Sequence, residues 1–330
     1  MSLQNNFSQT SPFGKITLLV VLMMVGVVIA LLVLVGLNLA FFHVPTDVVN
    51  HISSSSSAMA INAAKILQIT SQIGLFVLPA FVFAYLTCSS ATTGLKLNRR
   101  AKLQSAMLVI VITLLAIPFI NLLAQWNMDW HLPESWHVVE EWMRRTQDTN
   151  DKMITVLAQM NTKTDIVVNV LMMAILPAIG EELIFRGILQ PQMIKMTRNA
   201  HVGIILTAVI FSAFHLQFLG FFSRAILGII FGYLFYYSKN IRYPMIAHFV
   251  NNMFALGLIM VFGTKLEETN FENPYDTTTI AIAIITFGLS IALFWFTNTQ
   301  FKKETGQRLS QRQLLPCVLL LRLYHGRPCP

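Results

Sequence analysis

Three ionisable side chains lie inside one long apolar stretch of the sequence. The stretch begins near residue 166 and runs VVNVLMMAILPAIG before it reaches Glu181, Glu182 and, four residues on, Arg186. At about 1.5 Å per residue, Glu181 lies roughly 22 Å along such a helix, within the hydrocarbon of a bilayer or at its far edge. An ionised group there costs on the order of 3 kcal/mol, so each needs a partner or a wet cavity. A carboxylate in a poorly hydrated site also suits general-base chemistry near neutral pH.

Glu182 and Arg186 can satisfy each other. They are four residues apart with the acid on the N-terminal side, so they share a helix face in the favourable order. Glu181 points about 100° away and has no partner within its own helix. Two interpretations stay open from this segment alone. Either both glutamates belong to a structural ion cluster or a cytoplasmic collar, or Glu181 is kept for chemistry.

Two further apolar segments carry side chains of the types that hydrolysis uses. His215 follows Phe211 by four residues and His248 precedes Asn252 by four, so each pair shares a helix face. A general base contributes roughly 10² to 10⁴ to a rate and an oxyanion donor roughly 10² to 10³. Singly, such a histidine can be a packing residue and such an asparagine can join helices. Together with Glu181, at compatible depths, they favour an active site or an ion path.

The elements that must position these groups are membrane-spanning helices. The chain of 330 residues is 55% hydrophobic and 12% charged, with a mean hydropathy of +0.62, which is typical of a polytopic membrane protein. We predict an all-α fold, a bundle of about eight spans with the active site within the membrane. The serine run before residue 58 predicts a flexible loop up to Lys65, and the fourth span is expected to end at Pro191. The spans are expected at residues 16–42, 66–87, 103–124, 166–190, 202–219, 221–237, 244–262 and 277–296.

The distribution of charge gives the spans an orientation. With the N-terminus inside, every lysine and arginine cluster falls on one side and both acidic loops fall on the other. Short basic loops therefore explain the net charge of +8, and we predict no nucleic-acid partner. The region 125–165 holds seven acids against four bases and is expected outside. Its tryptophans suit an amphipathic helix at the membrane surface, although a small packed cap would use them equally well.

The three motifs together resemble a known family. EELIFR at 181–186, FSAFH at 211–215 and HFVNN at 248–252, in this order on successive helices, are similar to the motifs of the CPBP family of intramembrane proteases. That family includes the type II CAAX prenyl endopeptidases and many bacterial relatives of the Abi group. The resemblance covers about residues 166–262, while the first three spans and the tail carry no motif.

The resemblance implies a role for each matching residue. Glu181 would activate the water, His215 would hold the water or its proton, and His248 with Asn252 would stabilise the oxyanion of the tetrahedral intermediate. The pair of Glu182 and Arg186 would hold the helix and the base in place. The resemblance also implies an endopeptidase that cuts a membrane protein or a lipidated peptide in the lipid bilayer, and we expect no cofactor.

Three other interpretations remain open. Glu181, His215 and His248 also form a catalytic zinc set with an open fourth position, which would make the chain a zinc-dependent metalloendopeptidase. We favour the metal-free mechanism because the sequence contains no HExxH or other close pair of histidine ligands. Intramembrane Glu and His also suit a transporter or proton path, but no repeat of two related halves is found. A non-catalytic membrane scaffold is the third.

We divide the chain into three parts. Residues 1–165 hold three spans and the Trp-rich loop, 166–262 the catalytic helical core, and 263–330 the last span with a basic cytoplasmic tail. We expect an integral, multi-pass protein of a bacterial inner membrane with both termini cytoplasmic. The apolar run in the tail is too short to span and receives no role. The three cysteines lack the spacing of a disulfide or zinc framework and are expected to be packing residues or free thiols.

Overall fold

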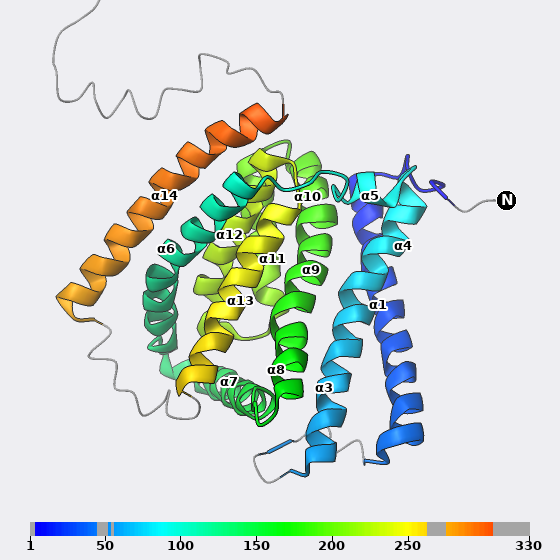
Figure 1. The fold of residues 1–330 in the computed structure, drawn as a ribbon, viewed down its shortest axis with the longest axis vertical. Coiled ribbons are helices and arrows are strands. Elements are labelled where there is room, and N and C mark those ends of the chain that lie inside the picture. Colours follow the sequence, from blue (N-terminus) through cyan, green and yellow to red (C-terminus); the bar gives the residue numbers. More distant parts are fainter. Residues whose placement is uncertain (1–3, 45–51, 54–55, 263–274, 306–330) are drawn as a thin grey trace, which may run out of the picture.

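The computed structural model describes residues 4–44, 52–53, 56–262 and 275–305, and these residues form helices and no strand (Figure 1). The predicted all-α fold is confirmed. The acidic loop at 263–274 and the tail at 306–330, with Cys317 and Cys329, lie outside the described residues. Cys88 is a free thiol.

Helical segments follow one another along the described chain, and several are joined end to end through π-helical turns. The first half contains α1 (Pro12–Leu37), η1 (Asn38–Phe42), α3 (Ala58–Gln72), η2 (Ile73–Val77), α4 (Leu78–Thr87), α5 (Ala91–Gly94), α6 (Leu103–Met128), η3 (Glu134–Trp136) and α7 (His137–Leu157). The second half contains α8 (Lys163–Asn169), η4 (Val170–Ile175), α9 (Leu176–Glu182), η5 (Leu183–Leu189), α10 (Gln190–Thr197), α11 (Ala200–Phe214), η6 (Phe218–Gly220), α12 (Phe221–Ser238), α13 (Arg242–Phe262) and α14 (Thr277–Thr305).

Seven continuous helices of the described residues are long and apolar enough to cross a membrane, which makes the chain an integral multi-pass membrane protein. They are Pro12–Phe42, Ala58–Thr87, Leu103–Met128, Lys163–Thr197, Phe218–Ser238, Arg242–Phe262 and Thr277–Glu304. The eighth predicted span corresponds to α11, which has 15 residues and so rises only about 22 Å. The prediction that this helix reaches residue 219 is wrong, because it ends at Phe214 and Leu216 takes a left-handed φ of 53°.

Two predicted boundaries are corrected by helix caps and π-helical turns. The second span begins at Ala58, eight residues earlier than expected, because the Ser57 side chain accepts a hydrogen bond from Ala60 N at 3.2 Å and caps the helix. The fourth span continues through Pro191 to Thr197. The π-helical turn η5 ends at Leu189, so Pro191 stands in the first turn of a new α-helical register, where proline is tolerated. Pro79 and Pro177 follow η2 and η4 in the same way.

The long helices stand side by side, with the start of α1 and the end of α14 at the same end of the bundle (Figure 1). Helix termini at this end carry the basic residues on which the predicted orientation rests, including Lys15, Arg198, Lys239 and Lys303. Helices α11 and α12 pack closely as antiparallel neighbours, as the short turn between them predicts. A shared core joins Phe76 and Phe83 of the N-terminal part to Phe185 and Phe211 beside the motifs.

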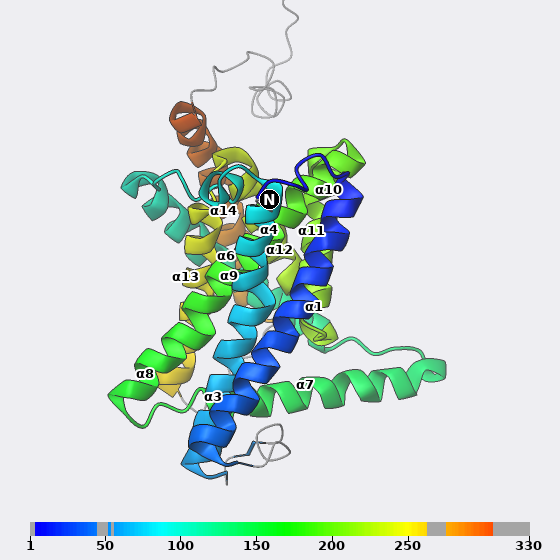
Figure 2. The same cartoon turned by 90° about the vertical axis from the view of Figure 1, so that its right-hand side faces the viewer.

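The amphipathic helix α7 crosses the opposite end of the bundle, nearly perpendicular to the spans (Figure 2). Two tryptophans of the region 125–165 pack against the bundle, as the predicted cap requires. Trp142 on α7 lies 5.3 Å from Phe218, and Trp130, which precedes α7, lies 4.9 Å from Phe222, so both cap the turn between α11 and α12. The two tryptophans are nevertheless 42% (Trp130) and 49% (Trp142) exposed.

Glu140 links α7 to the preceding segment through hydrogen bonds. Its carboxylate accepts hydrogen bonds from Leu132 N at 2.8 Å and from Arg144 Nε at 2.9 Å. These bonds, the backbone one first, lower the pKa of Glu140 to about 2. A carboxylate with a depressed pKa stabilises the fold above its unfolded pKa and loses that contribution only as the pH falls through the folded value. This attachment therefore holds throughout the physiological range.

The predicted orientation has a direct test. In a background with the native cysteines replaced by serine, Asn98→Cys marks the basic loop before α6 and Asp148→Cys marks α7, and both positions are exposed. We expect a membrane-impermeant maleimide to label Asp148→Cys on intact cells and Asn98→Cys only after permeabilisation. The opposite labelling pattern would reverse the orientation.

Candidate active site

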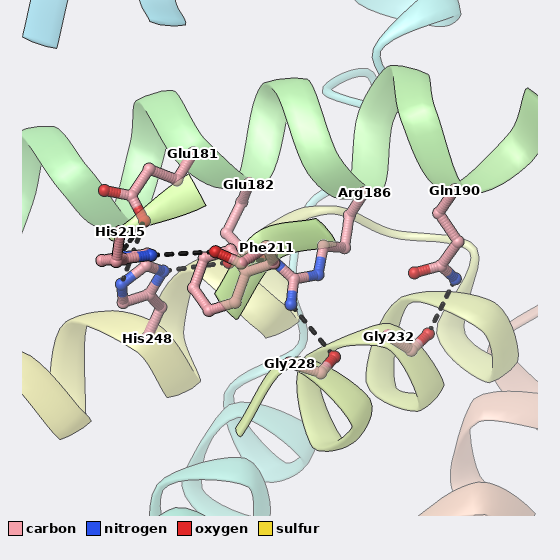
Figure 3. Close-up of polar contacts among 9 residues, drawn as sticks. All are labelled: Glu181, Glu182, Arg186, Gln190, Phe211, His215, Gly228, Gly232 and His248. Atoms are coloured by element: carbon pink, nitrogen blue, oxygen red, sulfur yellow. Dashed lines mark hydrogen bonds and ion pairs between the residues drawn. The ribbon is translucent and has the colours of Figure 1, made fainter. Parts of the chain in front are cut away.

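Three helices bring Glu181, His215 and His248 together (Figure 3). Glu181 is at the end of α9, His215 caps the C-terminus of α11, and His248 lies in the second turn of α13. The Nε2 atoms of His215 and His248 are each 3.9 Å from Glu181 Oε2. Glu181 is only 6% exposed, and among the described residues its Oε2 has no hydrogen-bond partner. The carboxylate is therefore buried and directed at both imidazoles.

Each histidine is oriented through its other ring nitrogen. His248 Nδ1 lies 2.9 Å from Glu182 Oε1, and His215 Nδ1 lies 2.8 Å from the backbone oxygen of Phe211. Since a carboxylate and a carbonyl oxygen only accept, each Nδ1 donates, and each Nε2 is left to face Glu181. The 3.9 Å separations are too long for direct hydrogen bonds and suit one bridging water.

The ion pair of Glu182 and Arg186 ties this cluster to two other helices. Arg186 Nη1 donates to Glu182 Oε1 at 2.9 Å, and both side chains are completely buried. Arg186 Nη2 donates to the backbone oxygen of Gly228 on α12 at 3.0 Å, and its guanidinium lies over the Phe211 ring at 4.7 Å. Because Glu182 also binds His248, the pair positions a histidine of the site as well as its own helix.

A second hydrogen bond from the fourth span to a backbone oxygen of α12 lies one turn further along. We did not predict it from the sequence. Gln190 Nε2 donates to the backbone oxygen of Gly232 at 3.0 Å. An added Cβ atom would lie 2.7 Å from Ile204 Cγ2 at Gly232 and 3.0 Å from Ala208 Cβ at Gly228, so a larger residue would clash with α11 at the first position and crowd it at the second. The signals were present in the sequence: polar residues every four positions at 182, 186 and 190, and a G-x-x-x-G pair in the facing helix.

Asn252 is not hydrogen-bonded to the cluster among the described residues. It lies one helical turn beyond His248 on α13, and its Oδ1 accepts a hydrogen bond from Asn251 Nδ2 at 3.3 Å. In the described part of the chain, no hydrogen bond joins it to Glu181, His215 or His248. Its position is near enough for a bound substrate to reach both groups, since one turn rises about 5.4 Å.

The three side chains are spaced somewhat more widely than the ligands of a bound zinc ion. Ligand atoms of a tetrahedral zinc site lie about 2 Å from the metal and hence about 3.4 Å from one another. The two separations from Glu181 Oε2 are wider, at 3.9 Å. Within the described ranges no group of three or more His, Cys, Asp or Glu side chains is arranged to hold a metal ion.

Comparison with known proteins bears on the segment that carries these residues. Residues 163–254 match the family model of type II CAAX prenyl endopeptidase Rce1-like proteins. The match contains all three motifs and confirms the resemblance over this segment, which spans α8 to the fourth turn of α13 and includes the Glu-His cluster. No curated protein and no solved structure matches the chain significantly.

Proposed function

We propose that this chain, which belongs to the Rce1-like CAAX protease family over residues 163–254, is an intramembrane endopeptidase that hydrolyses its substrate with a water activated by Glu181. The substrate is a membrane-associated protein or a lipidated peptide that enters from the surrounding bilayer. One observation carries the proposal: the buried Glu181 Oε2 has two histidine Nε2 atoms at 3.9 Å and no hydrogen-bond partner among the described residues.

In the proposed mechanism, Glu181 and His215 carry out the attack step. A water between them donates one hydrogen bond to Glu181 Oε2 and one to His215 Nε2, whose ring is fixed by the bond from Nδ1 to Phe211 O. This directs a lone pair of the water at the scissile carbonyl carbon. As the C–O bond forms, Glu181 takes the proton, and it later delivers this proton to the nitrogen of the leaving amine as the C–N bond breaks.

In the same mechanism, His248 and Asn252 stabilise the developing oxyanion. When His248 is protonated, its Nε2–H donates to the oxyanion while Glu182, bonded to Nδ1 at 2.9 Å, balances the imidazolium charge. The Asn252 amide is one turn away and supplies a second donor once the substrate is bound. Each role is filled by a side chain of this chain, and no step passes through a metal ion.

The experiment that tests this function uses the purified full chain in detergent with a peptide that ends in an S-prenylated C-a-a-X box. We expect the peptide to be cut and the activity to persist in 1,10-phenanthroline as it does in the non-chelating isomer 1,7-phenanthroline. Activity that vanishes only with the chelator and returns with zinc would contradict the metal-free mechanism. A chain that cuts neither this peptide nor its unprenylated form would contradict the proposed function itself.

A further inference from the structure

Arg224 is a partly buried cation inside the bundle whose hydrogen bonds, within the described residues, all go to neutral groups. It lies in the first turns of α12, where Nη1 donates to Gln217 Oε1 at 2.7 Å and Nη2 donates to the backbone oxygen of Gln217. The buried cations Arg186 and Lys65, in contrast, each pair with a carboxylate. Arg186 pairs with Glu182 at 2.9 Å, and Lys65 pairs with Asp165 at 3.0 Å. A guanidinium held at membrane depth without an acid is costly, which indicates that its anion comes from elsewhere.

Arg224 is attached to the segment that follows His215 of the candidate active site. Its guanidinium bonds to Gln217, which is two residues beyond His215, and its charge acts on the His215 imidazole. Two residues span at most about 7 Å of backbone, so the guanidinium is held beside the segment that carries His215. It also stands at the N-terminal end of α12, where the helix dipole favours an anion.

Arg224 retains donors for a ligand. A guanidinium has five N–H groups, of which the two bonds to Gln217 use two, and Nε is buried without a partner among the described residues. The acid whose charge reaches it is Asp151 on α7, which is beyond ion-pair distance. Asp151 is already engaged, since Gln147 Nε2 donates to its two oxygens at 2.9 and 3.0 Å.

We propose that Arg224 binds the C-terminal carboxylate of the substrate. This inference rests on the proposed function, because a C-a-a-X box is the last four residues of its protein and ends in a free carboxylate. At about 3.6 Å per residue, that carboxylate lies within roughly 11 Å of any peptide bond in the box, so the group that binds it must stand close to the site, as Arg224 does through Gln217. Arginine is the side chain best suited to a carboxylate, because its planar donors match both oxygens.

The test compares two peptides of identical sequence with an S-prenylated box, one ending in a free carboxylate and the other in a carboxamide. We expect wild-type protein to prefer the acid by roughly 10- to 100-fold in kcat/KM, since a charge-assisted bond is lost with the amide. In Arg224→Gln the ratio should fall to about one, and in Arg224→Lys, which keeps the charge but not the planar fork, to an intermediate value. Arg145→Gln, an exposed arginine of α7, is the matched control and should keep the full ratio.

The outcomes separate this inference from the proposed function. Wild-type protein that cuts both peptides equally well overturns the role of Arg224 and leaves the endopeptidase in place. Wild-type protein that cuts neither overturns the proposed function. If Arg224→Gln does not accumulate as folded protein, Arg224→Lys decides, because an unchanged acid-to-amide ratio in that variant overturns carboxylate binding.

Discussion

Glu181→Gln is expected to reduce peptide cleavage to background, a loss of roughly 10² to 10⁴ in kcat from the base alone. The amide has nearly the size of the carboxylate and can still accept a hydrogen bond from water, but it cannot take a proton. Since Glu181 Oε2 has no hydrogen-bond partner among the described residues, the substitution breaks no bond of the fold. The thermal unfolding temperature in detergent should therefore stay near that of wild type while turnover of the prenylated peptide disappears.

The matched control is Glu141→Gln, which makes the same chemical change at an exposed position of α7 and should cleave at the wild-type rate. His215→Ala and His248→Ala should be nearly as damaging as Glu181→Gln. Adding either to Glu181→Gln should cost little more, because groups that act on one water and one intermediate fail as a unit. Wild-type turnover by Glu181→Gln would remove Glu181 from the mechanism and the proposed chemistry with it.

Arg186→Ala is expected to destabilise the fold far more than Glu181→Gln does. The Arg186 side chain is fully buried, and its removal leaves Glu182 as an uncompensated charge and the backbone oxygen of Gly228 without its donor. Breaking such a pair typically costs about 3 to 5 kcal/mol. The yield of folded protein and its unfolding temperature in detergent should both fall.

Helix α7 contains an exposed ion pair with the same four-residue spacing, which serves as a control for Arg186→Ala. Glu141 and Arg145 form an ion pair four residues apart at 3.1 Å, but their side chains are 65% and 73% exposed. Exposed pairs contribute at most about 1 kcal/mol, so Arg145→Ala should leave the unfolding temperature almost unchanged. A fully stable but inactive Arg186→Ala would instead place Arg186 among the groups that act on the substrate.

Hydropathy was sufficient to locate seven of the eight predicted spans, because the bilayer accepts few alternatives to an apolar helix. The same constraint made the polar residues of the core informative, since Glu181, His215 and His248 had to meet a partner or a cavity, and the structure brings them to one point. The pairing of Glu182 with Arg186 could be predicted for a simpler reason, as it depends only on helical periodicity.

Contacts between helices could not be predicted in this way. The bond from Glu182 to His248 depends on how α9 and α13 are placed against each other, and no periodicity encodes that placement. Asn252 shares a helix face with His248 in sequence, yet its hydrogen bond is with Asn251. The extension of the fourth span past Pro191 depends on a π-helical turn, whose extra residue shifts the register of the helix that follows. A hydropathy profile does not detect such a shift.

The 15-residue length of α11 has a consequence for the irregular segment that follows it. This helix is about 8 Å shorter than the hydrophobic thickness of a typical bilayer, so the reversal at 215–220 stands at a depth where lipid offers no hydrogen bonds. Side chains supply them instead: Ser212 Oγ donates to Phe221 O at 2.6 Å, Ser223 Oγ donates to Gly220 O at 2.9 Å, and Asn127 Oδ1 accepts from Phe222 N at 3.2 Å. Three small polar residues thus act as a fixed solvation shell, which allows a non-helical backbone to persist beside His215 within the membrane.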